Sequence, residues 1–168
     1  MNLKALVKGY IGEKINSILL QQLPVNEYHI INNLILRLPD GSTTQIDHVI
    51  VSAYGIFVIE TKNYKGKIYG TERAGQWTQY LGQKSYPFMN PLHQNYKHVM
   101  ALRQMTGLEK DCFISIVAFS DEAKLKIHTT SHVVTFGEIV RTIRSYRVLK
   151  IAPDPIWLWS NNADLQWC

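Results

Sequence analysis

The chain has 168 residues, 46% of them hydrophobic, and a formal net charge of +5. This length suffices for one domain that buries a core without disulfides or a structural metal. The two cysteines, Cys112 and Cys168, lie far apart and form no CxxC pair, so the composition argues against a zinc module and favours a reducing compartment.

Every apolar run is interrupted by Lys, Arg, Glu or Gln, so none is long enough to cross a bilayer. Residues 1–4 lack the cationic segment and apolar core of a signal peptide. We therefore expect a soluble, cytoplasmic protein with no membrane partner. The positive charge is compatible with a polyanionic partner, but many soluble proteins carry as much charge for solubility alone.

The first predicted element is an amphipathic helix over residues 3–22, whose apolar side chains recur at helical spacing before Pro24. A strand is expected over residues 28–38, followed by the turn Pro39-Asp40-Gly41. Residues 45–51 and 56–62 are rich in β-branched and aromatic side chains. With Ser52-Ala53-Tyr54-Gly55 between them, they predict a β-hairpin.

Further short strands are expected over residues 67–71 and 76–81, with a turn at Gly75. Asn90 and Pro91 predict the start of a helix that runs to about Met105 and stops at Gly107. A buried strand over 112–119, a strand over 132–135 and a helix over 137–146 complete the series. This order predicts an α/β fold around one mixed sheet.

We expect residues 1–150 to form this domain. Residues 151–168 form a Trp-rich extension that either packs on the domain or mediates contacts, and we favour packing.

The hairpin predicts a polar site at its open end. With a loop of two or four residues, paired positions sum to 107, so Asp47 lies opposite Glu60 and Gln45 lies opposite Lys62 on one face. Two adjacent carboxylates repel each other unless a cation lies between them, and Mg²⁺ prefers such oxygen ligands. Lys62 could orient a water or stabilise charge on a phosphate. A plain ion pair between Lys62 and the two acids is an equally good reading of the hairpin alone.

Several dispersed motifs extend the pattern: Gly12-Glu13, Gln45-Ile46-Asp47-His48, the run from Gly55 to Asn63, Gly66, Trp77, Asn90-Pro91 and Gln94. Asp47 followed by Glu60-Thr61-Lys62 resembles the PD-(D/E)xK motif of restriction-endonuclease-like nucleases, with Ile46 where the motif's name has proline. Over roughly residues 9–120 the chain is most similar to the nuclease-related domain (NERD) branch.

The resemblance implies a restriction-endonuclease-like α/β fold, with a central mixed sheet flanked by helices, and a nuclease that acts on DNA with Mg²⁺ or Mn²⁺ as cofactor. It implies that Asp47, Glu60 and Glu13 are metal-binding acids and that the backbone carbonyl of Thr61 is a further ligand. Lys62 resembles the catalytic lysine, and Gln94 resembles a glutamine that approaches the metal from the following helix. Attack by a metal-activated water would leave a 5′-phosphate.

Each of these residues has a simpler reading. Glu13 could be an ordinary solvated helix residue. Gln94 and His98 share a helix face, and in the simpler reading they do no more than hydrogen-bond each other. We assign no role to His98. His48 lies on the opposite strand face from Asp47, which favours packing. Trp77 and Tyr80 could stack on bases, but aromatic strand residues more often pack in a core.

For the whole chain, the alternative to a nuclease is a catalytically silent nucleic-acid-binding or regulatory module of the same fold. A protein-interaction domain that uses the Trp-rich tail is a third reading.

Overall fold

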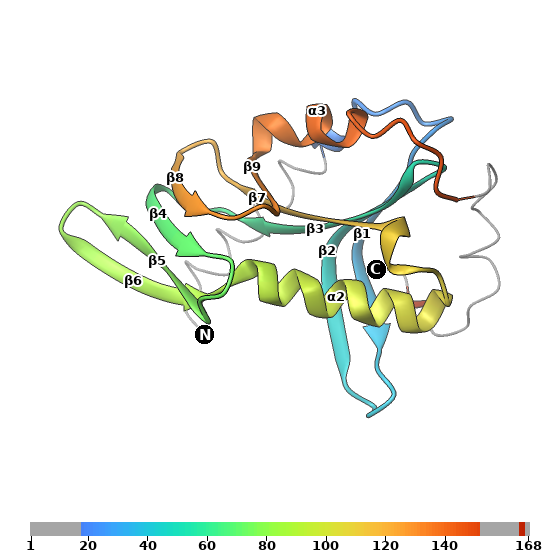
Figure 1. Cartoon of the computed structure of the whole chain (residues 1–168), viewed down its shortest axis with the longest axis horizontal. Coiled ribbons are helices and arrows are strands. Elements are labelled where there is room, and N and C mark those ends of the chain that lie inside the picture. Colours follow the sequence, from blue (N-terminus) through green and yellow to red (C-terminus); the bar gives the residue numbers. More distant parts are fainter. Residues whose placement is uncertain (1–17, 152–164, 167–168) are drawn as a thin grey trace.

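The structure, a computed structural model, describes residues 18–151 and 165–166 (Figure 1). Of the helix expected over residues 3–22, residues 18–22 fall within this part; residues 18–20 are helical and residues 21–22 form a turn. Glu13 and the three tryptophans of the C-terminal extension lie outside the described residues. Among the described residues, no helix has both the length and the apolar character that a membrane crossing requires.

The larger sheet has six strands in the order β10-β1-β2-β3-β7-β9. β1, β2 and β3 form an antiparallel meander, whereas β7 and β9 add in parallel beyond β3. The strands are β1 (His29–Arg37), β2 (Thr43–Ser52), β3 (Gly55–Lys62), β7 (Phe113–Phe119), β9 (His132–Thr135) and β10 (Leu165–Gln166). The strands predicted from residue 28 to residue 62, and those near 112–119 and 132–135, are confirmed.

Helices cover both faces of this sheet (Figure 1). Helix α2 (Pro91–Thr106) packs through Val99 and Leu102 on the face that carries Val49 and Val58. The short helices η2 (Phe136–Glu138) and α3 (Ile139–Arg144) pack on the other face. Another short helix, η1 (Lys110–Cys112), precedes β7. Alternate residues of β2 and β3 therefore fill two separate apolar layers.

Local signals set the bounds of α2 as the sequence predicts. The side chain of Asn90 accepts a hydrogen bond from the backbone N–H of Leu92 at 2.9 Å, and Pro91 follows it. Gly107 ends the helix with φ 68°, a left-handed conformation that glycine adopts without a steric penalty.

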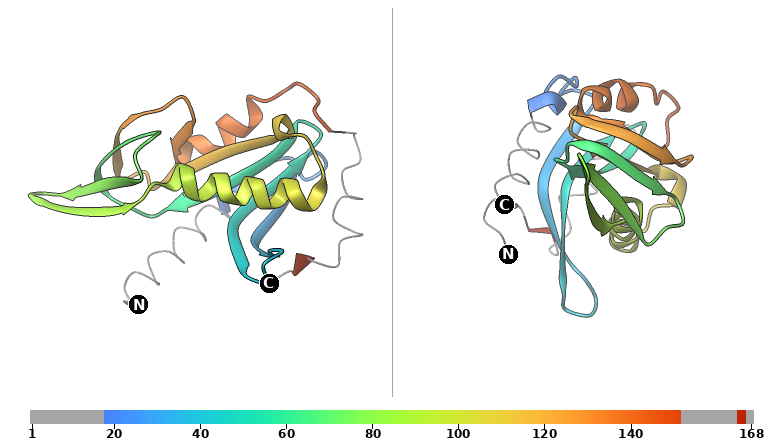
Figure 2. Two further views of the ribbon diagram at one scale, coloured as in Figure 1. Left: turned by 60° about the horizontal axis from the view of Figure 1, so that its bottom comes forward. Right: turned by 90° about the vertical axis from the view of Figure 1, so that its left-hand side faces the viewer.

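A second, four-stranded sheet in the order β6-β5-β4-β8 begins where β3 and β7 end. Figure 2 shows the hairpin of β5 and β6 extending away from the body. Its strands are β4 (Gly66–Thr71), β5 (Gln76–Leu81), β6 (Lys84–Met89) and β8 (Ala123–His128). The sequence predicts β4 and β5 but places them in a single sheet, and it does not predict β6 or β8. The α/β, restriction-endonuclease-like class of the fold is confirmed, with two mixed sheets where one was expected.

The second sheet is attached to the body by a small aromatic core. Trp77 is 1% exposed, stacks on Phe119 at 6.2 Å between ring centroids, and donates from its indole N–H to the carbonyl of Thr71 at 2.9 Å. The ring fits because Gly70 has no side chain. A Cβ at that position would lie within 2.4 Å of the ring. Trp77 is thus a core residue, as the simpler reading predicted.

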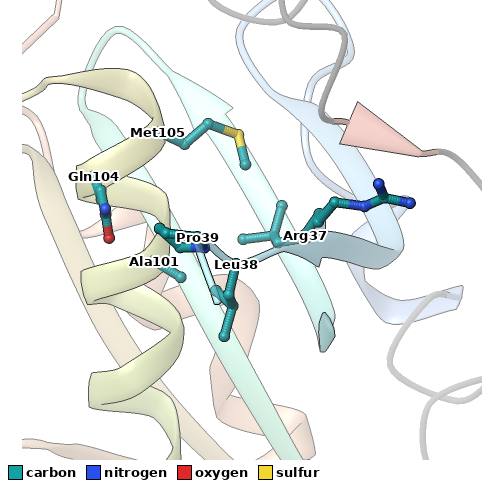
Figure 3. Close-up of a pocket in the computed structure, with 7 residues that line it drawn as sticks. Arg37, Leu38, Pro39, Ala101, Gln104 and Met105 are labelled. Carbon is teal, nitrogen blue, oxygen red and sulfur yellow. The ribbon is translucent and has the colours of Figure 1, made fainter. Parts of the chain in front are cut away.

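A hollow of about 360 Å³ lies between the C-terminal half of α2 and the turn that joins β1 to β2 (Figure 3). It is lined by Leu36, Arg37, Leu38, Pro39, Ala101, Gln104 and Met105. This lining includes no Asp or Glu, so the hollow offers no carboxylate ligand to a hard cation.

Candidate active site

The register of the β2–β3 hairpin follows the predicted rule. The pairs run from Ser52 and Gly55 to His48 and Ile59, and each pair sums to 107. The ladder stops there, because β2 continues along β1 while β3 continues along β7. The predicted direct opposition of Gln45 and Lys62 is therefore wrong.

Asp47 lies one step past the last ladder pair and binds the neighbouring strand through its side chain. Its Oδ2 accepts hydrogen bonds from the backbone N–H of Thr61 at 2.7 Å and from the Thr61 hydroxyl at 2.8 Å. Burial, and next the charge of Glu60, raise the pKa of Asp47, against the opposing effect of the two bonds from Thr61. The two carboxylates therefore interact, although they do not form the backbone pair that the sequence predicted.

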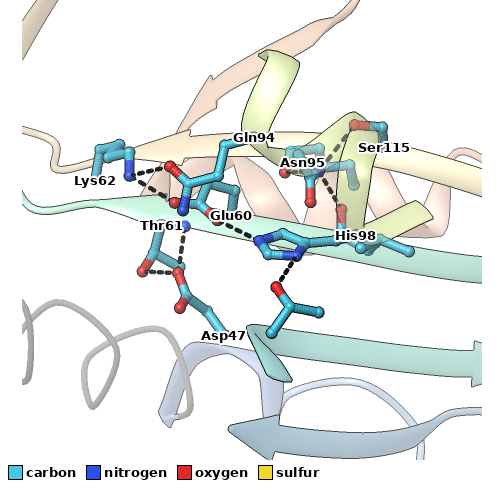
Figure 4. Close-up of polar contacts among 11 residues, drawn as sticks. Asp47, Glu60, Thr61, Lys62, Gln94, Asn95, His98 and Ser115 are labelled. Carbon is cyan, nitrogen blue, oxygen red and sulfur yellow. Dashed lines mark hydrogen bonds and ion pairs between the residues drawn. The ribbon is translucent and has the colours of Figure 1, made fainter. Parts of the chain in front are cut away.

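Glu60 is the buried centre of the polar contacts, with 2% of its surface exposed (Figure 4). Its Oε1 accepts a hydrogen bond from the ammonium of Lys62 at 2.5 Å. The same ammonium donates to Oε1 of Gln94 at 3.1 Å. A carboxylate, an ammonium and an amide from two elements far apart in the sequence thus meet at one point.

His98 joins the same contacts from the next turn of α2. Its Nε2 lies 3.4 Å from Oε2 of Glu60, an electrostatic contact without hydrogen-bond geometry, and its Nδ1 lies 3.2 Å from the hydroxyl of Thr44. The reading in which Gln94 and His98 bond only each other is wrong, because they contact Lys62 and Glu60. The sequence assigned His98 no role, although its spacing of four residues from Gln94 placed it on the same helix face.

Asn95 fixes the position of α2 relative to β3 and β7. It is fully buried, and its amide donates to the carbonyl of Val58 at 2.8 Å, the hydroxyl of Ser115 at 2.8 Å and the carbonyl of Ile116 at 3.2 Å. These bonds fix the helix across β3 and β7. The neighbouring Gln94 is placed over the end of β3 as a consequence.

We call Asp47, Glu60, Lys62, Gln94 and His98 the polar cluster. Of the predicted site residues, the structure brings together Asp47, Glu60, Thr61, Lys62 and Gln94.

His48 points away from the polar cluster, as its position in the strand predicts. Its Nδ1 lies 2.7 Å from Oδ1 of Asn32, and burial lowers its pKa to about 4. A neutral, buried imidazole on the opposite face of the sheet serves the packing of the fold.

The polar cluster can offer a cation the two carboxylates of Asp47 and Glu60. Within the described part of the chain no group of three or more His, Cys, Asp or Glu side chains is arranged around a common point. Oxygen donors of this kind suit Mg²⁺, which commonly binds one or two protein carboxylates together with water and substrate phosphate. Mutual repulsion between the two acids is also what a bound cation relieves.

A mixed sheet whose central hairpin ends in two acids and a lysine, with helices on both faces, defines a restriction-endonuclease-like domain. The chain belongs to the nuclease-related domain (NERD) family, whose model matches residues 8–120. The predicted family is confirmed.

The chain is also similar to a relative from Bacillus anthracis, described as uncharacterized protein pXO1-01. The two are 38% identical over 153 residues, which cover 89% of this chain and 72% of the relative. No solved structure matches the chain significantly.

Proposed function

We propose that the protein is a Mg²⁺- or Mn²⁺-dependent nuclease that hydrolyses phosphodiester bonds in DNA. The observation that supports this most strongly is the meeting of Asp47, Glu60 and Lys62 beside Gln94. Family membership supports a function related to nucleases. The proposal adds the metal, the substrate and the role of each residue.

The two carboxylates are the proposed metal ligands. The remaining oxygen of Asp47 and those of Glu60 are hard donors, and the Thr61 carbonyl and Glu13 would complete the protein's share of the ligands. A bound Mg²⁺ supplies Lewis acidity and makes a coordinated water more acidic. The chain's own contribution is to bring the two carboxylates together where burial, and next the charge of Glu60, raise the pKa of Asp47.

Lys62 is the proposed catalytic lysine. Its ammonium is positioned by two oxygens, at 2.5 Å from Glu60 and 3.1 Å from Gln94, and its side chain is mostly buried. A cation held in this way can orient an attacking water or stabilise the charge that develops on the scissile phosphate. A plain ion pair would not require the additional amide contact from α2. The product would carry a 5′-phosphate.

The first prediction concerns Lys62→Ala. Cleavage of single- and double-stranded DNA should fall by about 10²–10³-fold, because one electrostatic group acting on the transition state is removed. DNA affinity measured in EDTA should stay near wild type. The melting temperature should fall, because Glu60 is then buried without its counter-ion. Lys110→Ala, which removes an exposed lysine at the amino end of β7, is the matched control and should cleave normally.

A Mg²⁺ titration with an EDTA control accompanies these assays. Wild-type protein that cleaves no DNA or RNA at any metal concentration would contradict the proposal and favour the catalytically silent module. If Lys62→Ala lowers the melting temperature but leaves cleavage unchanged, Lys62 is only the counter-ion of Asp47 and Glu60.

A further inference from the structure

The second sheet has two faces of opposite character. Ile68, Trp77 and Phe88 point inward and pack near Phe119. We call the other side the outer face. It consists of Lys67, Tyr69 and Thr71 of β4, Gln76, Thr78 and Tyr80 of β5, Ser85, Pro87 and Met89 of β6, and Lys124, Lys126 and His128 of β8.

The pairing register aligns these side chains in rows across the four strands. Lys124, Lys67 and Tyr80 form one row, and Lys126 and Tyr69 lie in the next. All positions of the outer face are exposed except Thr78, which is half-buried, and none of them holds Asp or Glu. None of its three lysines forms an ion pair with another residue of the described ranges. The outer face is therefore a cationic surface without internal neutralisation.

Two tyrosine rings stand among these lysines. Tyr69 and Tyr80 are 42% and 40% exposed, and their ring centroids lie 5.4 Å apart in an edge-to-face arrangement. Beside them the sheet is hollowed by about 660 Å³, with Thr71, Lys126 and His128 in the lining. Exposed aromatic rings on a sheet are not needed for the core of this protein, which uses the inner face.

We propose that the outer face binds a single-stranded segment of nucleic acid. Lys124 and Lys126 are on alternate residues of one strand, about 6.6 Å apart along it, a spacing comparable to that of successive phosphates in an extended strand. Tyr69 and Tyr80 offer ring faces and edges to unpaired bases, whereas the bases of a duplex are already stacked on each other. The class of ligand, nucleic acid, rests on the proposed function; the surface and the strandedness do not.

The test measures binding in EDTA, so that cleavage plays no part. A labelled single-stranded oligodeoxynucleotide and the duplex of the same sequence are titrated with wild type and with Lys124→Glu/Lys126→Glu. Single-strand affinity should fall at least about tenfold, and the slope of log affinity against log salt should shrink by about 1.4, since each lost phosphate contact on a single strand removes about 0.7. Lys110→Glu/Arg144→Glu makes the same charge change on exposed residues of other elements and should bind like wild type.

A second variant tests the aromatic part. Tyr69→Leu/Tyr80→Leu keeps apolar side chains on the strands but removes the rings, and it should weaken single-strand binding by about fivefold or more, as expected for lost base stacking. Duplex binding should change much less. Equal losses on both ligands, or a loss on the duplex alone, would overturn the single-strand assignment.

The outcomes separate this surface from the proposed nuclease activity. If wild type cleaves DNA and the Lys124→Glu/Lys126→Glu variant binds and cleaves as wild type does, the outer face is not a binding surface and the nuclease proposal stands. If wild type does not cleave but the variant loses single-strand binding, the surface stands and the nuclease proposal fails. A wild-type protein that binds neither ligand overturns the surface.

Discussion

The polar cluster, at the ends of the interior strands β2 and β3, and the outer face of the second sheet both gather charged side chains, but the surroundings of these charges are opposite. In the polar cluster Glu60 and His98 are almost fully buried, and Lys62 and His98 both contact Glu60. On the outer face the lysines are exposed and form no ion pair with another residue that the structure describes. Buried, mutually oriented charges suit a chemical step, because a preorganised site needs no rearrangement during reaction. Exposed charges of one sign suit a polyanion.

The largest effect on stability should come from the inner side of the second sheet. Trp77→Ala should lower the free energy of unfolding by about 3–5 kcal/mol, because it leaves a cavity beside Phe119. Tyr80→Ala, three residues on and facing out, should change it by less than about 0.5 kcal/mol. Denaturant titrations of both variants check this contrast. Similar losses in both would mean that the outer face contributes to the fold.

A smaller effect is expected from the buried histidine on the far side of the larger sheet. Burial lowers the pKa of His48 to about 4, so the unfolded chain takes up a proton as the pH falls below about 6.5 whereas the folded chain does not. The titration of His48 therefore does not lower the free energy of unfolding at neutral pH. It lowers this free energy by about 3 kcal/mol as the pH falls from 6.5 towards 4.

His48→Gln removes this titration, so its free energy of unfolding should depend less on pH between 7 and 4 than that of wild type. His29→Gln, at an exposed position of β1, is the matched control. Parallel pH profiles for wild type and His48→Gln would show that the imidazole is not held neutral.

The smallest change in stability, and the sharpest contrast with the outer face, is expected for Asp47→Asn. The pKa of Asp47 is raised because burial, and next the charge of Glu60, disfavour its charged form in the folded protein, so its contribution to stability improves as the pH falls and is least favourable at neutral pH. The amide oxygen of asparagine can still accept the bonds from Thr61. The metal-free variant should melt slightly higher than wild type, while its Mg²⁺ affinity falls at least about tenfold. Calorimetry with and without Mg²⁺ measures both, and a lower melting temperature would contradict the raised pKa of Asp47.

The sequence predicted the hairpin and its register because β-branched residues and a two-residue loop before Gly55 restrict the pairing to one alignment. It did not predict that the strands part after His48, because the competing partners β1 and β7 are distant in sequence. The prediction of Gln94 as a site residue came from the family resemblance. The place of His98 in the polar cluster could not be predicted, because it depends on the position of α2, which the long-range hydrogen bonds of Asn95 fix.

The second sheet shows a signal that sequence reasoning overlooked. Residues 123–128 alternate between small or apolar residues and Lys or His, the period of a half-buried strand, and they form β8. β6 is harder to predict, because Pro87 interrupts its pattern and most of its side chains are exposed. Its pairing is visible only once β5 is in place.

The carbonyl oxygen of Lys62 ties the two sheets together mechanically. It accepts the N–H of Tyr64 at 2.8 Å on the way to β4 and the N–H of Ser120 at 3.0 Å on the way to β8. Both connections from the larger sheet to the smaller one are thus fastened to one peptide group, that of the residue whose ammonium contacts Glu60. A displacement of the second sheet that moves either connection therefore acts on this peptide group, and so on the backbone of the proposed catalytic lysine.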